Sequence, residues 1–351
     1  MTARLALSIG CPSGIGPEVS VAAAAESGSL ARILLVGAHD VIVRAATVTG
    51  VDAARLVRVE EPAAAWGLAP GIIGTWTPGG AARSPAVPGK PRPADGAAQL
   101  AWVDAACDLA SSGVASAMVT GPVSKDVIAS SGAPRSKQFL GHTEHLQRRL
   151  RAGEVIMAFW SERFTTALVT THLPLARVAR AITAERVASA TFWLAKLLVQ
   201  LGDGASRPRI AVCGLNPHAG EAGRLGREEI TAISPGIVAA RARLGSARRK
   251  VVLEGPVPAE TAFRKAARED GVYDGVVAMY HDQATIPMKL VGFGESVNVS
   301  LGLPIVRTSV DHGTGYDIAG EGLADARGMH EAIALAVRLS AAKDRTRSAR
   351  R

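Results

Sequence analysis

Short apolar runs of strand length alternate with longer alanine- and leucine-rich segments of helical period along the whole chain, and this alternation is the feature that most restricts the fold. Parallel strands need long crossover connections, which are usually helices, so the pattern predicts an α/β protein with a largely parallel sheet. We expect strands at Arg4–Ile9, Arg32–Val36, Ser116–Thr120, Thr165–Thr170, Arg209–Gly214 and Gly275–Tyr280. We expect helices at Pro17–Glu26, Gly96–Ser112, Ala184–Leu201, Ser234–Leu244, Ala259–Asp270 and Met329–Ala342.

Two stretches lack the period of either element and are predicted to be loops. The first, residues 78–93, is rich in proline and glycine. The second, residues 302–329, carries aspartate, histidine and threonine between glycines. Long loops of the second kind inside a compact domain usually serve function.

The composition is that of an ordinary globular protein. A chain of 351 residues with 48% hydrophobic residues can bury a large core, and its length favours two domains. The sequence contains no run of roughly 20 apolar residues of the kind that crosses a bilayer, and its first residues do not resemble a signal peptide. Cys11, Cys107 and Cys213 lie far apart without CxxC spacing, which suggests neither a disulfide framework nor a thiolate zinc site. We therefore expect a soluble, cytoplasmic protein.

The net charge of +9 raises the alternative of a nucleic-acid-binding protein. Part of the charge lies in the final segment RLSAAKDRTRSARR, which we expect to be a solvated, disordered end. No aromatic-interleaved basic stripe accompanies it, so nucleic acid is not the expected partner. A cationic cleft for an acidic small molecule would account for the remaining charge equally well.

Three histidines directly follow predicted strands. FTTALVTT leads into His172, RIAVCGL leads toward His218, and GVVAMY leads into His281. In open α/β sheets ligands bind beyond the carboxyl ends of the strands, so residues far apart in sequence can converge there. Each histidine alone could equally be a structural hydrogen-bonding residue. Together they favour a divalent metal site of three imidazoles with open positions for substrate or water.

Four of the other histidines are of two kinds. His142 lies beside Thr143 in FLGHTEHL, where a loop leads toward a helix. A substrate contact and a helix cap made by Thr143 explain this pattern equally well. His39, His145 and His330 have no comparable setting and are expected at the surface.

The segment GCPSGIGPE follows the first predicted strand and opens a helix. Its backbone could approach an anion. However, it lacks the lysine of a P-loop and the third glycine of a dinucleotide fingerprint, so a tight strand-to-helix turn is the favoured interpretation. Lys289 and Asn298 lie between His281 and the second loop, and Arg307 lies within the range of that loop. They would suit a substrate with phosphate and carboxylate groups, although single residues of these types usually form a solvated face.

Eight blocks, taken in order, resemble the 4-hydroxythreonine-4-phosphate dehydrogenase family of pyridoxal phosphate biosynthesis. They are GCPSGIGPE, VTGPVSK, FLGHTEHL, VTTHLPL, GLNPHAGEAGRLGREE, GPVPAET, MYHDQATIPMK and PIVRTSVDHGTGYDIAG. The segment DHGTGYDIAGEGLAD is also similar to the adenosine-binding loop of isocitrate and isopropylmalate dehydrogenases. The resemblance implies two α/β/α domains around a cleft rather than a classical Rossmann fold. We expect residues 1–135 plus 296–351 to form one domain, and residues 136–295 to form the other, which carries the metal ligands and a dimer interface.

The same resemblance implies the roles of individual residues. His172, His218 and His281 would hold one divalent metal ion, zinc, magnesium or cobalt, in a homodimer whose subunits both contribute to the site. The phosphorylated substrate would be bound by His142, Thr143, Lys289, Asn298 and Arg307, with His142 and Lys289 as the catalytic pair. NAD, or NADP, would be bound around His312, Gly313 and Asp317.

The implied reaction is oxidation of 4-phosphooxy-L-threonine by NAD, followed by decarboxylation to 3-amino-2-oxopropyl phosphate. A sister activity on 4-phosphoerythronate or 4-phosphothreonate would need the same groups and is the alternative. One departure concerns the segment GCPSGIGPE, where the family usually reads GDPAGIGPE and this chain has Cys11 and Ser13. That departure bears on the choice of substrate more than on the class of reaction.

Overall fold

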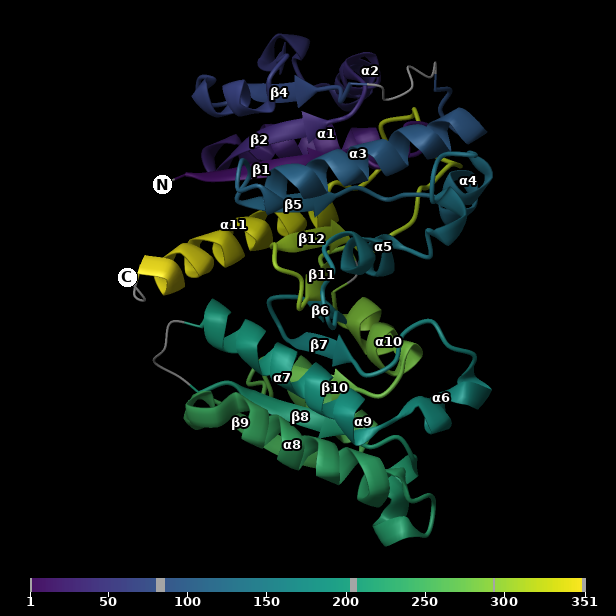
Figure 1. Cartoon of the computed structure of the whole chain (residues 1–351), viewed down its shortest axis with the longest axis vertical. Coiled ribbons are helices and arrows are strands. Elements are labelled where there is room, and N and C mark those ends of the chain that lie inside the picture. Colours follow the sequence, from purple (N-terminus) through teal and green to yellow (C-terminus); the bar gives the residue numbers. More distant parts are fainter. Residues whose placement is uncertain (1, 80–85, 203–206, 293, 349–351) are drawn as a thin grey trace. The chain divides into compact units, whose positions relative to one another are not determined.

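The computed structural model describes residues 2–79, 86–202, 207–292 and 294–348 (Figure 1). Its contacts divide the chain into two compact units. The discontinuous unit extends to Gly153 and resumes at Leu303, whereas the central unit is Glu154–Gly302. These borders lie later than the expected ones at 135/136 and 295/296.

Specific contacts account for both borders. Helix α5 (His142–Arg149) is tied to helix α3 (Pro93–Ser111), because Arg149 forms a bidentate ion pair with Asp108 at 2.6–2.7 Å. Strand β11 (Val297–Leu301) pairs with β6 (Ile156–Trp160) of the central unit.

The discontinuous unit contains a parallel sheet in the order β3-β4-β2-β1-β5-β12. Its strands are β1 (Ala3–Ser8), β2 (Ala31–Val36), β3 (Leu56–Arg58), β4 (Ile73–Trp76), β5 (Ala117–Thr120) and β12 (Arg307–Val310). Besides α3 and α5, its helices are α1 (Gly16–Glu26), α2 (His39–Thr49), α4 (Lys125–Ser130) and α11 (Arg327–Ser348). Helix α1 packs against α2 and α11, whereas α3 packs against β1 and β5 and crosses in front of the strands in Figure 1. Because Ser8 pairs with both Val36 and Thr120, neighbouring strands end at one edge.

The central unit contains a mixed sheet in the order β11-β6-β7-β10-β8-β9. The first three strands pair antiparallel, and the last four pair parallel. The remaining strands are β7 (Thr165–Leu168), β8 (Arg209–Cys213), β9 (Val252–Val257) and β10 (Gly275–Ala278), and the helices are α6 (Leu175–Ala181), α7 (Ala184–Leu201), α8 (Ser234–Leu244), α9 (Ala259–Ala267) and α10 (His281–Val291). Helix α7 packs against α8 and the strands. Phe159, Phe164, Phe263 and Met288 form part of a buried core between the strands and helices α9 and α10.

The predicted α/β fold is confirmed. All six predicted strands and all six predicted helices are present, and their ends agree within three residues except at the last helix. That helix continues to Ser348, so the expectation of a disordered basic end is wrong up to that residue, and 349–351 lie outside the described residues. No helix in the described ranges is both long and apolar enough to cross a membrane.

Of the two predicted loops, the second is partly wrong. Residues 311–326 have no helix or strand, but β12 lies within the range predicted to be loop. All four residues of β12 are buried, so the strand shows no alternation of polar and apolar residues. Its hydroxyl groups are satisfied internally, since Thr308 donates to the carbonyl of Ala332 at 2.7 Å and Ser309 donates to that of Thr120 at 3.1 Å. In the first loop, residues 80–85 lie outside the described part of the chain.

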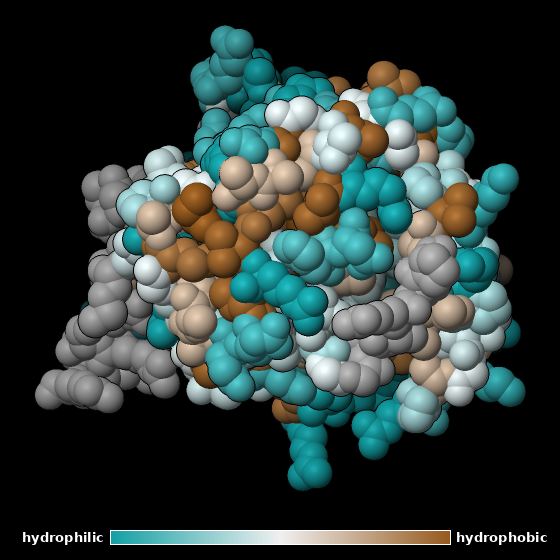
Figure 2. Space-filling view, turned by 90° about the horizontal axis from the view of Figure 1, so that it is seen from above, coloured by the Kyte–Doolittle hydropathy of each residue, from teal (hydrophilic) through white to brown (hydrophobic). Residues whose placement is uncertain are grey.

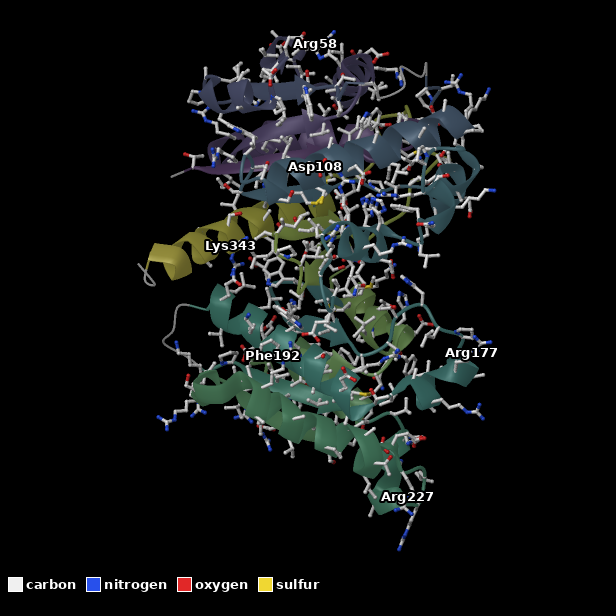
Figure 3. The ribbon with its side chains drawn as sticks, viewed as in Figure 1. Arg58, Asp108, Arg177, Phe192, Arg227 and Lys343 are labelled. Carbon is white, nitrogen blue, oxygen red and sulfur yellow. The ribbon has the colours of Figure 1, made fainter. Side chains whose placement is uncertain are left out.

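Glu154 fastens helices α7 and α8 to the start of β6. Its carboxylate pairs with Arg243 and accepts hydrogen bonds from Ser189 at 2.5 Å and from the indole of Trp193 at 2.7 Å. Arg243 also stacks on Phe192, which is labelled in Figure 3, with 4.0 Å between its guanidinium carbon and the ring centroid. The Arg243 hydrogen bond is the main reason that the pKa of Glu154 falls to about 2 from 4.5.

We expect Glu154→Gln to lower the free energy of unfolding at pH 7 by about 1–2 kcal/mol, because the site is partly exposed. A depressed carboxylate pKa stabilises the folded state above the unfolded-state pKa, and this stabilisation is lost as the pH falls toward the folded-state value. The difference between wild type and variant should therefore shrink as the pH falls from about 4.5 to about 2. Urea titrations across this range, with exposed Glu162→Gln as control, measure it. A constant difference would contradict the assignment.

Candidate active site

Two of the three histidines that follow strands lie side by side in the central unit. Thr170 continues the pairing of β7. Its hydroxyl donates to the carbonyl of Met279 at 2.7 Å, and its backbone amide donates to the same carbonyl at 3.2 Å. Two residues beyond each of these positions, the rings of His172 and His281 have centroids 5.5 Å apart and planes inclined by 40°. The parallel register of the strands thus brings the two imidazoles together.

This pair fits a shared divalent ion. Two imidazoles that ligate one tetrahedral ion at about 2.0–2.1 Å have ring centres roughly 5 Å apart. His281 also has the second interaction typical of a ligating histidine, because its Nδ1 lies 2.7 Å from Oδ1 of Asp282. That contact leaves Nε2 of His281 as the ring nitrogen that could face a ligand. The roles of the two ring nitrogens of His281 are inferred from this hydrogen bond.

His218 lies on an unusual turn after β8. His218, Ala219, Glu221 and Ala222 all have positive φ, between 41° and 57°, within the segment Pro217–Gly223. Left-handed backbone costs non-glycine residues roughly 1–2 kcal/mol each, so such a run persists only where surrounding contacts enforce it.

Glu229 supplies those contacts. Its Oε1 accepts the backbone amides of Leu215 and Asn216, both at 2.8 Å, and its Oε2 accepts Nδ2 of Asn216 at 3.0 Å. A Cβ at Gly220 would lie 2.6 Å from the same carboxylate, so the turn packs directly on it. Burial favours a higher pKa for Glu229, but the hydrogen bonds from Asn216 and Leu215 outweigh burial and lower it. Glu229 is therefore an ionised, buried support for the turn that carries His218.

A second brace joins the ends of β8 and β10. The side chain of Gln283 donates to the carbonyl of Gly214 at 3.0 Å and accepts the amide of Met279 at 2.6 Å. It thereby fixes the starts of the turns that carry His218 and His281. Within the ranges that the structure describes, however, no three histidine, cysteine, aspartate or glutamate side chains are grouped closely enough to hold a metal ion. The pair His172 and His281 is formed, and the contribution of His218 stays a prediction.

We expect Glu229→Gln to weaken divalent metal binding by about 10–100-fold, as is usual when a supporting hydrogen bond behind a ligand is lost. The amide nitrogen would face Nδ2 of Asn216, another donor, and release the left-handed turn. Isothermal titration with Zn²⁺ measures the effect, and Glu185→Gln, an exposed change on α7, is the matched control. An unchanged affinity would show that the turn does not carry a ligand.

His142 and Arg307 form a cationic site in the discontinuous unit. Arg307 on β12 is 2% exposed and donates from Nη2 to Oγ1 of Thr120 at 2.7 Å. Burial lowers its pKa to about 9, against the opposing effect of Glu144. Burial also lowers the pKa of His142 well below its ordinary value, and the charges of Arg307 and Lys125 act in the same direction. A neutral imidazole thus lies beside a buried cation, and an anionic ligand would stabilise this arrangement.

The local structure decides two alternatives left by the sequence. His142 is the first residue of α5, and the N-cap, Gly141, makes no side-chain cap, so Thr143 is not a helix cap. Thr143 is buried, and Nε2 of His142 is inaccessible to solvent and has no hydrogen-bond partner among the described residues. The solvated-face alternative is wrong for buried Arg307. The expectation of a surface position is wrong for His145, whose Nε2 lies 2.6 Å from Asp104 and whose side chain is 11% exposed.

His39 also differs from the expectation of a surface residue, because it is half-buried and its Nδ1 lies 2.7 Å from Oγ1 of Thr75. The other proposed substrate residues belong to the central unit. Lys289 is exposed on α10, about 12 Å along the helix axis from its first residue, His281. Asn298 is half-buried on β11, opposite Phe159 of β6.

The segment GCPSGIGPE, residues 10–18, packs against the glycine-rich loop of residues 311–326. The amide of Ile15 donates to the carbonyl of Thr314 at 2.8 Å, and a Cβ at Gly14 would lie 2.5 Å from that oxygen. The glycine is therefore needed for close contact between backbones, and the interpretation as a tight turn is confirmed. Pro17 is in the first turn of α1.

The proposed nucleotide residues lie at the start of the glycine-rich loop. Nδ1 of His312 lies 3.0 Å from the carbonyl of Gly313, while Nε2 is inaccessible and has no hydrogen-bond partner among the described residues. Gly313 and Asp317 are exposed. Nothing within 4 Å would obstruct a Cβ at Gly313, so its backbone is approachable.

The departure at Cys11 and Ser13 has a clear structural setting. Sγ of Cys11 lies 3.4 Å from the hydroxyl of Tyr316. Burial raises the pKa of Cys11, and it raises that of Tyr316 to about 12, so both groups are neutral at pH 7. Ser13 donates to buried Asp95 at 2.6 Å, and the amide of Arg92 donates to the same oxygen at 2.9 Å. Where the family usually has an aspartate, this chain therefore has the neutral thiol of Cys11, which contacts Tyr316 of the glycine-rich loop.

Sequence reasoning missed the residues that act through others, namely Asn216, Glu229, Gln283 and Glu18. Each falls within a quoted block, such as GLNPHAGEAGRLGREE, but nothing in a block distinguishes a supporting carboxylate from a solvated one. Burial was the missing signal.

Comparison with known proteins gives one consistent result. Residues 29–336 match the family model described as Pyridoxal phosphate biosynthetic protein PdxA. The chain is 40% identical over 335 residues to a 4-hydroxythreonine-4-phosphate dehydrogenase of Desulfosudis oleivorans, covering 95% of each chain. Among solved structures, it matches a 4-hydroxythreonine-4-phosphate dehydrogenase from Klebsiella pneumoniae with a TM-score of 0.81 and 33% identity, over 96% of this chain and 99% of that one.

A second solved structure carries a different name. A terephthalate 1,2-cis-dihydrodiol dehydrogenase from Burkholderia xenovorans matches with a TM-score of 0.63 and 30% identity, over 96% of this chain and 98% of that one. Similar chains thus carry names for different substrates. The family match covers most of this chain and both of its units, and the chain therefore belongs to the PdxA family of pyridoxal phosphate biosynthetic proteins.

Proposed function

We propose that this protein is an NAD-dependent, metal-requiring 4-hydroxythreonine-4-phosphate dehydrogenase of pyridoxal phosphate biosynthesis. The observation with most weight is the likeness to relatives of that name over 95% of both chains. The paired imidazoles of the central unit and the buried cation of the discontinuous unit support it, because the reaction needs a metal ion and an anion-binding site. A cytoplasmic location agrees with the lack of a membrane-spanning helix among the described residues.

In this proposal His172, His218 and His281 hold the metal. When bound, a divalent ion supplies Lewis acidity that lowers the pKa of the substrate hydroxyl and stabilises the charge developed during decarboxylation. His312, Gly313 and Asp317 would bind NAD, or NADP, which would supply the hydride acceptor. Three neutral imidazoles leave the ion its full positive charge, which favours that chemistry.

The remaining residues bind the substrate and handle protons. Arg307 binds the phosphate or carboxylate group of the substrate, because a guanidinium can donate two parallel hydrogen bonds. Thr143, Lys289 and Asn298 complete the binding set. Burial lowers the pKa of His142, so its imidazole is neutral at pH 7 and keeps one ring nitrogen as an acceptor for a proton. Lys289 serves as the second proton-handling group.

The proposed enzyme is a homodimer in which both subunits contribute to each site. The support is a set of exposed apolar side chains near the metal and substrate residues of the central unit. Leu175 on α6 is 71% exposed, and Ile286 and Leu290 on α10 are 60% and 81% exposed. Exposed large apolar side chains of this kind are what a contact surface between subunits would use. Light scattering after gel filtration tests the dimer, and Leu290→Glu should shift it toward monomer.

A substrate panel tests the function. The protein is stripped of metal with a chelator, supplied separately with Zn²⁺, Mg²⁺ or Co²⁺, and assayed for NADH formation from each substrate. We expect 4-phosphooxy-L-threonine to give the highest kcat/KM. Higher values with 4-phosphoerythronate or 4-phosphothreonate would assign the sister activity, and a preference for a cis-dihydrodiol would overturn the proposal. NADP in place of NAD sets the nucleotide preference.

The nucleic-acid alternative finds less support. On the face drawn in Figure 2, hydrophilic and apolar residues are intermixed. Several arginines are engaged internally, among them Arg149, Arg243 and Arg307. DNA retention that weakens steeply with salt and disappears on removal of the basic C-terminal residues would favour this alternative.

A further inference from the structure

Glu18 is a buried acidic residue that no substrate or metal assignment uses. It lies in the first turn of α1 and is 4% exposed. Its two carboxylate oxygens each accept one backbone amide of the glycine-rich loop, from Gly320 at 2.7 Å and from Gly322 at 3.1 Å. A single carboxylate thus binds two amides that are 302 and 304 residues away in the sequence.

The two glycines have left-handed backbone, with φ of +89° at Gly320 and +69° at Gly322. Alternating backbone amides in such turns form a concave site for an anion. The structure places the Glu18 carboxylate in that site. These two amides are therefore already engaged and are not donors for a phosphate of a bound nucleotide.

The glycine-rich loop has no helix or strand between residues 311 and 326, so its shape depends on contacts of this kind. The Ile15–Thr314 hydrogen bond and the Cys11–Tyr316 contact fix its first part. Glu18 fixes its second part. A Cβ at Gly320 would lie 2.7 Å from Pro88, so this part also packs closely on the chain before α3.

We propose that Glu18 is a positioning residue for nucleotide binding: by holding the amides of Gly320 and Gly322, it sets the shape of the loop that carries His312, Gly313 and Asp317. The inference rests on the proposed function, because that function assigns the nucleotide to this loop. It adds that the carboxylate acts as an internal anion in a backbone site and does not touch the nucleotide.

The choice of variant follows from the geometry. Glu18→Gln keeps the size of the side chain but presents an amide nitrogen to one of the two backbone amides, so one hydrogen bond is replaced by two opposed donors. Glu18→Ala removes both. Glu26→Gln makes the same charge change at an exposed position of the same helix and is the matched control.

Two readouts are measured on the intact protein with metal bound. The first is hydrogen exchange of peptides covering residues 311–326, which requires no activity. We expect exchange about tenfold faster in Glu18→Gln and faster still in Glu18→Ala, with Glu26→Gln like wild type. The second is kinetics, where we expect the KM for NAD to rise about tenfold in Glu18→Gln while the KM for the phosphorylated substrate stays unchanged.

Each outcome decides the inference. Loop exchange equal to wild type in Glu18→Gln overturns it, and so does faster exchange with an unchanged KM for NAD. A general fall in melting temperature with equal effects on both KM values indicates a merely structural role and also overturns it. If the wild-type protein neither binds nor reduces NAD, the proposed function fails, and the exchange data still show whether Glu18 shapes the loop.

Discussion

Replacing His281 with alanine should lower metal-dependent NADH formation by about a thousandfold or more while leaving the fold intact. The ring lies 5.5 Å from that of His172 and is positioned by Asp282, so its loss removes half of the imidazole pair. Lewis-acid stabilisation of developing charge is worth several kcal/mol, which corresponds to an effect of this size. The measurements are kcat at saturating Zn²⁺, metal content, and circular dichroism.

His330→Ala is the matched control, because His330 is a half-exposed histidine of α11 in the other unit. It should retain wild-type activity and metal content. Full activity in His281→Ala would remove the central role assigned to this residue. Loss of activity with unchanged metal content would instead place His281 among the substrate contacts.

Replacing Arg307 with lysine should raise the KM for the phosphorylated substrate by about 10–100-fold. Arginine offers two parallel donors to a carboxylate or phosphate, and an ammonium group cannot reproduce that geometry. Burial adds to the effect, since it lowers the pKa of Arg307 to about 9, and a buried lysine starts from a lower ordinary pKa of about 10.4. The arginine stays charged at pH 7, whereas the lysine loses charge more readily.

Initial rates over a range of substrate concentrations at pH 7 measure this effect. Arg58→Lys is the control, because Arg58 is an exposed residue of strand β3 in the same unit and is labelled in Figure 3. Unchanged kinetics in Arg307→Lys would show that the guanidinium does not meet the substrate. The pH dependence is a second measurement, because wild-type substrate binding should weaken as the pH rises through about 9 and the cation is lost.

A similar solved structure is named a cis-dihydrodiol dehydrogenase, so membership of the family does not by itself fix the substrate. The substrate panel does. The neutral contact between Cys11 and Tyr316 lies in the segment where this chain departs from the usual family pattern. That contact shapes the glycine-rich loop and does not belong to the set of residues proposed for phosphate or metal. Under the proposed function, the departure therefore concerns nucleotide binding first.

The α/β fold was predictable from the sequence because strand and helix periods are local properties. Each predicted strand is an apolar run long enough to be recognised alone, and the carboxyl ends of parallel strands meet by geometry. The approach of His172 to His281 follows from that argument. Short β12 was not predictable, because three of its four residues, RTSV, are polar although all four are buried.

What only the tertiary structure decided is which polar residues are buried. In the sequence Glu18, Glu154 and Glu229 look like any solvated glutamate, yet each carboxylate is held by donors that lie between 13 and 304 residues away in the sequence. Burial lowers the pKa of Arg307 to about 9, and its neighbours Thr120 and Glu144 come from β5 and α5. Period and turn chemistry are encoded within a few residues, whereas the desolvation of a charge depends on atoms hundreds of residues away, and so it becomes fixed only when the chain has folded.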